Sequence, residues 1–149
     1  MEQTKELLFA NGSYLMVMLD DLPNHEKINN YIKNIKILHI TIKYNPLLND
    51  IELYHLEKLG ETVNVLTKSI SISEKNIIRI DVDIMLFNNN TILNKLDNGV
   101  CHITINVPYE YKPIDANYFE PIEIYEYIHV LKGIYCLMDS KNHMPIFNL

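Results

Sequence analysis

One four-residue pattern occurs twice in this chain, as His39-Ile40-Thr41-Ile42 and as His102-Ile103-Thr104-Ile105. Each copy lies within a short apolar run that predicts a β-strand. Because successive side chains of a strand point to opposite faces, the His and the Thr of each copy share one face and the two Ile share the other. The pattern therefore predicts a buried Ile pair beneath an imidazole and a hydroxyl.

Two such strands, placed side by side, would bring His39, Thr41, His102 and Thr104 around one cavity. One imidazole can accept a proton while the other donates one, because unperturbed His titrates near neutral pH. The two hydroxyls can donate hydrogen bonds to phosphate oxygens as negative charge develops there. These four residues are thus the predicted catalytic residues of a phosphodiester-cleaving site, and the pattern leaves open which His is the acid and which is the base.

The pair of motifs resembles the signature of the two-histidine (2H) phosphoesterase superfamily, the LigT-like proteins, which carry two His-hydrophobic-Thr/Ser-hydrophobic motifs at a comparable separation. The segment from Pro108 to Asn117 is also similar to the one that follows the second motif in viral and phage members. The resemblance implies a bilobal fold with a central cleft, and a metal-independent phosphodiesterase. In viral and phage members it further implies hydrolysis of nucleotide messengers of host defence, such as cGAMP, related cyclic oligonucleotides or 2′-5′-linked oligoadenylates.

Two other functions stay open at this point. One is RNA repair, in which the enzyme opens a 2′,3′-cyclic phosphate at an RNA end, as other LigT-like proteins do. The other is a non-catalytic nucleotide-binding module, although a pure binder would not need two imidazoles. A zinc site needs three or four converging ligands, and Cys101 is expected on the opposite strand face from His102. We therefore expect neither a metal nor another cofactor, and no Cys–His dyad.

Aromatic side chains lie beside both motifs and could stack on nucleotide bases. Tyr44 follows the first motif, Tyr109 and Tyr111 follow the second, and Tyr14 lies in the N-terminal strand. Stacking on such rings contributes about 1–3 kcal/mol per base. We predict these four as substrate-binding residues, and the alternative is that they pack on or cover the core.

The remaining polar candidates are expected to have no catalytic role. His25, His55, His129 and His143 have no Thr two residues further on, so we interpret them as surface or packing residues. Asp81 and Asp83 alternate in an apolar run, which is typical of a solvated strand face. Cys101 and Cys136 are too few for a disulfide scaffold and are expected to be reduced and buried.

Charge and composition bear on the partner and on the location. The net charge of the 149-residue chain is −6, and Arg79 is its only arginine. Proteins that hold long nucleic acids usually show a basic stripe, so a small nucleotide is the expected partner and no long nucleic acid. No apolar run is long enough for a membrane span, and the acidic N-terminus lacks the features of a signal peptide. A cytoplasmic location, without a membrane partner, is therefore expected.

The hydrophobic pattern predicts a single domain over residues 1–149 with interleaved strands and helices. Tight hairpins favour antiparallel pairing, and the predicted fold class is therefore α+β, with two antiparallel sheets and flanking helices implied by the resemblance. Helices are predicted from Asn24 to Ile35 and from Asn49 or Asp50 to Leu59. The predicted strands are Ser13–Leu19, Ile37–Tyr44, Val63–Leu66, Lys68–Ser73, Asn76–Phe87, Val100–Val107, Ile122–Tyr127 and His129–Met138.

Overall fold

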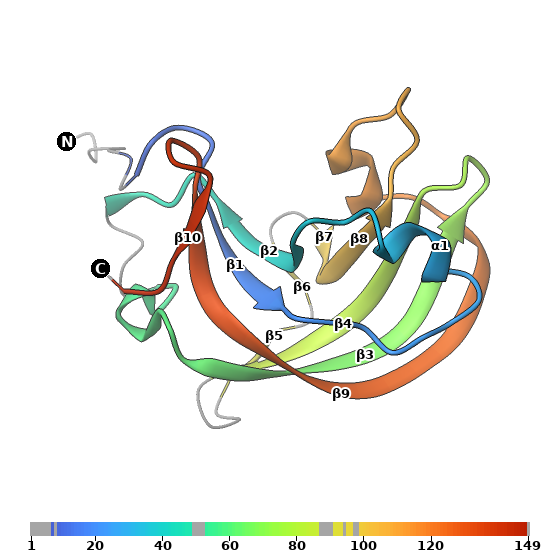
Figure 1. Cartoon of the computed structure of the whole chain (residues 1–149), viewed down its shortest axis with the longest axis horizontal. Helices are drawn as coiled ribbons and strands as arrows, with labels where there is room; N and C mark the ends of the chain where they lie inside the picture. The colour runs from blue at the N-terminus through green and yellow to red at the C-terminus, as the bar shows by residue number, and fades with distance from the viewer. Residues whose placement is uncertain are drawn as a thin grey trace.

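The computed structural model describes residues 7, 9–48, 53–86, 91–93, 95–96 and 99–148. Most of its elements are β-strands (Figure 1). In chain order they are β1 (Tyr14–Leu19), α1 (Asn29–Ile32), β2 (Leu38–Tyr44), η2 (Leu56–Lys58), β3 (Thr62–Ser73), β4 (Ile78–Leu86), β5 (Thr91–Leu93), β6 (Lys95–Leu96), β7 (Gly99–Val100), β8 (His102–Asn106), η3 (Pro113–Asn117), β9 (Pro121–Asp139) and β10 (Met144–Ile146).

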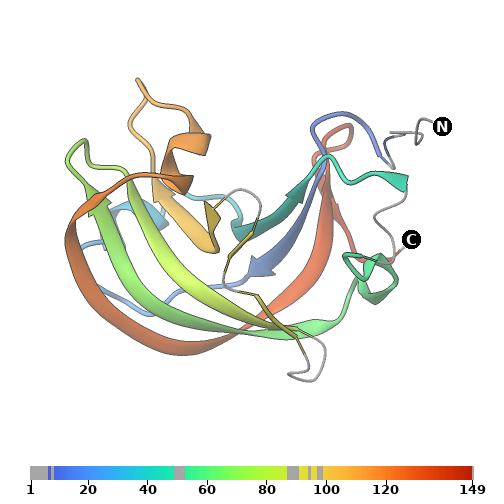
Figure 2. The same ribbon diagram turned by 180° about the vertical axis from the view of Figure 1, so that it is seen from behind.

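In this part of the chain, six strands close an antiparallel barrel in the order β1-β2-β8-β4-β3-β9, and β9 pairs again with β1. The closure depends on the length of β9, which has 19 residues. Most of β9 pairs with β3, and its second half pairs with β1 from Gly133 to Met138. Figures 1 and 2 show β3, β4 and β9 as long curved ribbons that sweep around one side of the molecule.

The predicted α+β fold, with two lobes, two antiparallel sheets and flanking helices, is therefore wrong, because the strands close into one barrel. Of the helix predicted from Asn24 to Ile35, only the four residues of α1 are helical, and no side chain caps its start. Ile28, Ile32 and Ile35 have helical spacing and pack on the core, but the intervening asparagines are weak helix formers. The second predicted helix is reduced to η2, and its predicted cap at Asn49 or Asp50 lies outside the described residues.

Two pairs of predicted strands are each one continuous strand. The runs Val63–Leu66 and Lys68–Ser73 form β3, whose register with both neighbours shifts between Thr67 and Ser69. Such a bulge breaks the two-residue alternation without ending the strand, which is why the pattern predicted two strands there. The last two predicted strands likewise form β9, and the segment beyond Asp139 adds β10 at its end.

Gly133 lets the barrel close. It is paired with Val63 on β3 and with Leu19 on β1, so strands flank it on both sides. A Cβ at this position would lie 2.4 Å from Cγ1 of Val17 and 3.0 Å from the carbonyl oxygen of Met18. Only glycine fits where β1 approaches β9 this closely.

The barrel interior is a hydrophobic core in which most side chains are aliphatic. The Ile residues of both motifs belong to it, because Ile40 and Ile103 are fully buried. Other large side chains buried there include Leu15, Leu56, Ile70, Ile78, Ile80, Ile84, Tyr135 and Leu137. No helix among the described residues is long and apolar enough to span a membrane.

Candidate active site

The two motif strands are neighbours in the barrel wall. β2 and β8 pair antiparallel, with Ile40 opposite Ile103. In an antiparallel pair of this register, position 39 lies across from position 104 and position 41 across from position 102, so each His faces the Thr of the other motif. Burial alternates along both strands, with the Ile side chains buried and the His and Thr side chains on the opposite, partly open face. The predicted alternation is confirmed.

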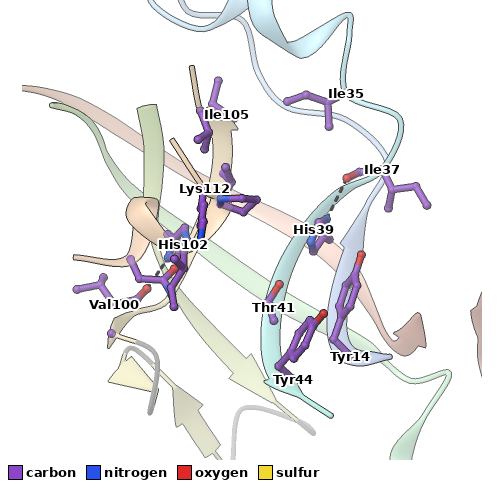
Figure 3. A pocket seen from close by; sticks show the side chains of 16 residues that line it. Tyr14, Ile35, Ile37, His39, Thr41, Tyr44, Val100, His102, Ile105 and Lys112 are labelled. Carbon is purple, nitrogen blue, oxygen red and sulfur yellow. Dashed lines mark hydrogen bonds between the residues drawn. The ribbon is translucent and has the colours of Figure 1, made fainter. Parts of the chain in front are cut away.

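His39, Thr41, His102 and Thr104 all line one cavity of about 840 Å³ (Figure 3). In the close-up, β2 carries His39 on one side of the cavity and β8 carries His102 on the other. This volume is within the range of small-molecule sites. The other lining residues are mainly apolar and include Ile35, Ile37, Val100, Ile105, Val107, Pro113 and Ile114.

In both imidazole rings, Nδ1 is hydrogen-bonded to a backbone carbonyl. Nδ1 of His39 lies 3.0 Å from the carbonyl oxygen of Ile37, and Nδ1 of His102 lies 2.7 Å from that of Val100. A carbonyl oxygen only accepts hydrogen bonds, so Nδ1 carries the proton in each neutral ring. This leaves Nε2 of both rings with a lone pair available in the cavity. The carbonyl is two residues before the His in each motif, and the two copies therefore present the same chemistry.

Burial lowers the pKa of His39 and of His102, and the hydrogen bonds to the Ile37 and Val100 carbonyls partly oppose this. The pKa of His102 is also lowered by Arg79 and His39 and raised by Asp81. Both rings are thus biased toward the neutral form, which is the form that can accept a proton. An anionic phosphate in the cavity would raise both pKa values, which favours protonation of one ring.

Hydrogen-bond donors for an anion complete the polar part of the cavity. The hydroxyls of Thr41 and Thr104 make no hydrogen bond to another residue that the structure describes, and both line the cavity. Lys112 lines it as well, and its ammonium group has no ion-pair partner within the described ranges. Two hydroxyls and one ammonium group can together bind phosphate oxygens.

Two of the four predicted aromatic residues line the cavity. The ring of Tyr14 lies 5.3 Å from that of His39 and 6.1 Å from that of Tyr44, with the two Tyr rings nearly parallel at 9°. These three rings form a row along one wall, and Tyr44 is 54% exposed at its outer end. Tyr109 and Tyr111 are not among the lining residues, and Tyr109 is 98% exposed.

The other histidines and the cysteines are not among the residues that line the cavity. His25 and His129 pack edge-on against Tyr127, and His55 lies 3.7 Å from Glu57. Cys101 is buried, and burial together with the negative charge of Asp83 raises its pKa to about 12. Its thiol is therefore unsuited to act as a nucleophile beside His102.

Sequence reasoning did not assign a role to two cationic residues near the site, Arg79 and Lys112. Arg79 is nearly fully buried and forms an ion pair with Asp81, Nε to Oδ1 at 2.7 Å. The side chain of Asp81 is only 16% exposed, so the predicted solvated face is wrong at this residue. Arg79 is the only basic residue of its strand and gave no pattern, whereas Lys112 lies in the Pro108–Asn117 segment that the resemblance had singled out.

Within the described residues, no three His, Cys, Asp or Glu side chains are grouped closely enough to hold a metal ion.

Compared with models of known protein families, with curated proteins and with solved structures, the chain gives no significant match. The 2H resemblance therefore remains an inference from the two motifs.

Proposed function

We propose that this protein is a metal-independent phosphodiesterase of the 2H type that hydrolyses a small nucleotide. The observation that carries the proposal is that both motifs have the same arrangement of imidazole and hydroxyl groups. Each motif holds its imidazole by Nδ1, leaves Nε2 available and places a hydroxyl beside it, and both copies line one cavity. One buried histidine with a local hydrogen bond is common in protein cores, whereas two equivalent ones across a cavity suit paired acid–base catalysis.

In the proposed reaction, the neutral imidazole takes a proton through Nε2 from water or from a ribose hydroxyl next to the phosphate. The deprotonated oxygen forms a bond to phosphorus, and the bond from phosphorus to the leaving oxygen breaks. The second ring, protonated beforehand, gives its Nε2 proton to that leaving oxygen. The hydroxyls of Thr41 and Thr104 and the ammonium of Lys112 stabilise the charge on the non-bridging oxygens.

The shape and charge of the site favour a small substrate. The ring row of Tyr14 and Tyr44 can stack on a base, and the apolar wall with Ile35 and Ile114 can pack on a second one. The single arginine is bound to Asp81 and is not available to a phosphate backbone. A cyclic dinucleotide such as cGAMP, or a short 2′-5′-linked oligonucleotide, fits these features better than a long RNA. Removal of such a messenger would counter host defence, as the resemblance to viral and phage members suggests.

A substrate panel tests this proposal. The protein is incubated with 2′3′-cGAMP, 3′3′-cGAMP, 2′-5′ oligoadenylate and an RNA that ends in a 2′,3′-cyclic phosphate, each with and without excess chelator, and the products are separated by chromatography. We expect chelator-resistant cleavage of at least one of the first three. Cleavage of the RNA end alone would favour the RNA-repair function, and loss of cleavage on chelation, restored by Zn²⁺ or Mn²⁺, would overturn the metal-independent mechanism.

Two variants serve as matched controls for the panel. In His102→Asn, the amide nitrogen can still donate to the Val100 carbonyl, but Nε2 is gone. His143→Asn makes the same change at an exposed residue outside the cavity, in a left-handed conformation that Asn tolerates. The first variant should lower cleavage by about 10²–10⁴-fold, and the second should leave it unchanged. Equal loss in both would show that the activity does not come from this cavity.

A further inference from the structure

Arg79, the only arginine of the chain, lies on β4 directly beside the second motif. In the pairing of β4 with β8, Arg79 is opposite Thr104 and Asp81 is opposite His102. The side chain of Arg79 is buried, with 6% of the residue exposed. A charged group this deep in a barrel wall needs several partners to offset its lost hydration.

The guanidinium of Arg79 connects β4 to the segment after β8. Its Nε donates to Asp81 at 2.7 Å, and its Nη1 donates to the carbonyl oxygen of Ala116 at 3.0 Å. Its Cζ also lies over the ring of Phe119, 4.3 Å from the ring centre. The second oxygen of Asp81 accepts a hydrogen bond from Ser71 at 3.0 Å, so the carboxylate is fixed from both sides. Only a planar fork can make the first two bonds at once.

The segment that Arg79 holds is one wall of the cavity. Lys112, Pro113, Ile114 and Asn117 all line the cavity, and they lie in or next to η3, which Figure 1 shows beside β8. Ala116, whose carbonyl Arg79 binds, is the buried residue of η3. Arg79 is therefore hydrogen-bonded to the segment that forms this wall.

The same segment packs against the backbone that orients His102. A Cβ at Gly99 would lie 2.8 Å from the carbonyl oxygen of Asn117 and 3.2 Å from the ring of Tyr118. Gly99 precedes Val100, whose carbonyl oxygen accepts the hydrogen bond from Nδ1 of His102. Contacts thus run from Arg79 through Ala116 and Asn117 to Gly99, and from there to His102.

The residues that the structure describes provide no equivalent support for the first motif. The carbonyl that orients His39 belongs to Ile37, which precedes β2, and no ion pair within the described ranges involves a residue of β2. His39 instead packs against the ring of Tyr14. The two histidines are therefore alike in chemistry and different in what holds them.

We propose that Arg79 is a positioning residue for the second motif: it clamps the segment 113–119 onto Gly99 and thereby fixes the ring of His102 and the Lys112 wall, but not His39. The catalytic consequence rests on the function proposed above. The orientation of His102 itself does not, and it can be measured without any substrate.

The first arm of the test reads the imidazole rings by NMR. Ring nitrogen resonances of His39 and His102, assigned with the His→Asn variants, are compared in wild type, Arg79→Lys, Phe119→Leu and the control Lys68→Met. Lysine keeps the charge but cannot reach both Asp81 and Ala116, and Phe119→Leu removes only the ring beneath the guanidinium. The control removes an ion pair of the same sheet, Lys68 with Asp83 at 3.4 Å, which is far more exposed.

In both test variants we expect the Nδ1-protonated tautomer of His102 to lose its predominance while the signals of His39 stay unchanged, and the control should change neither. Equal changes at both histidines, or no change at His102, would overturn the proposal. Phe119→Leu leaves the buried ion pair intact, so it still gives a result if Arg79→Lys does not fold.

The second arm measures steady-state kinetics on whichever nucleotide the panel identifies. A displaced catalytic group can cost about 10²-fold in rate, so kcat should fall by about this factor in Arg79→Lys and stay at the wild-type value in Lys68→Met. Failure of the proposed function is distinct: wild type would then cleave nothing, while the NMR arm would still show the effect on His102. A wild-type kcat in both test variants would refute the positioning role.

Discussion

The closure of the barrel can be tested by adding a Cβ atom at Gly133. In Gly133→Ala the new methyl would lie 2.4 Å from Cγ1 of Val17 and 3.0 Å from the carbonyl oxygen of Met18. Val17 is fully buried and β-branched, so its side chain has no other rotamer into which it can move easily. Overpacking of this kind costs about 1–3 kcal/mol. Because one of the two contacts is with backbone, we expect about 3 kcal/mol, the upper end of that range.

For a chain of this length, 1 kcal/mol corresponds to a change in Tm of about 2–4 °C, so Gly133→Ala should melt roughly 6–12 °C below wild type. Urea and thermal unfolding, followed by circular dichroism, would measure both quantities. In the double variant Gly133→Ala/Val17→Ala the colliding methyl is gone, so its loss of stability should be smaller than the sum of the two single losses. Lys132→Ala, at the exposed neighbouring position, serves as the control and should change stability by less than about 0.5 kcal/mol. A Gly133→Ala protein as stable as wild type would refute the pairing of β1 with β9, and with it the closed barrel.

Three further predictions concern the site. Burial lowers the pKa of His39 and His102 below the ordinary value of 6.5, so the unfolded chain binds more protons than the folded one once the pH drops below that value. The contribution of these histidines to the free energy of unfolding should therefore be complete above about pH 6.5 and should be lost as the pH falls toward the folded-state pKa values. Denaturant titrations at pH 7.5, 6.5 and 5.5 would measure this decrease, which should be weaker in a His39→Asn/His102→Asn protein. Tyr44→Ala removes a half-exposed ring of the stacking row. The loss of about 1–3 kcal/mol per stacked base should raise the Kd of a nucleotide, measured by calorimetry, about 5- to 150-fold. The control Tyr109→Ala, at an exposed residue, should leave this Kd unchanged. Finally, a cyclic dinucleotide or a short 2′-5′-linked oligonucleotide should be cleaved faster than a long RNA with a cyclic-phosphate end, and its binding should depend weakly on salt because few phosphates are neutralised; faster cleavage of the long RNA, with a steep salt dependence, would contradict this.

The local features of the site followed from the sequence because they depend on the two-residue period of a strand. That period alone put His39 and Thr41 on one face and Ile40 on the other, and it did the same for the second motif. It also put Cys101 on the buried side, away from His102. Each of these relations involves residues within a few positions of one another.

The fold could not be predicted in the same way, because it depends on contacts between distant parts of the chain. The pairing of β1 with β9 joins residues 14–19 to residues 133–138, and it requires the absence of a side chain at Gly133. The bulge near Lys68 interrupts the two-residue alternation of β3, so the sequence predicted two strands instead of one. The resemblance to the 2H proteins led to two sheets with helices, whereas the asparagines around Ile28 and Ile32 allow only a four-residue helix.

The supporting residues of the site were missed for a related reason. Arg79 acts through Ala116, 37 positions further along the chain, and no periodic pattern connects them. Tyr14 joined the cavity because β1 pairs with β2, whereas Tyr109, adjacent in sequence to the second motif strand, projects into solvent. Proximity in sequence therefore identified Tyr44 beside the first motif, but it was wrong for Tyr109 and Tyr111 beside the second.

The central claim is that His39 and His102 act as one acid–base pair, and a double-mutant cycle on kcat/KM tests it most directly. His39→Asn and His102→Asn should each lower kcat/KM by about 10²–10⁴-fold, because each removes one proton-transferring Nε2. If the two rings act as a unit, the double variant should be little worse than either single one. If the rings act independently, the losses would multiply to about 10⁴–10⁸-fold, and such a result would contradict the shared site.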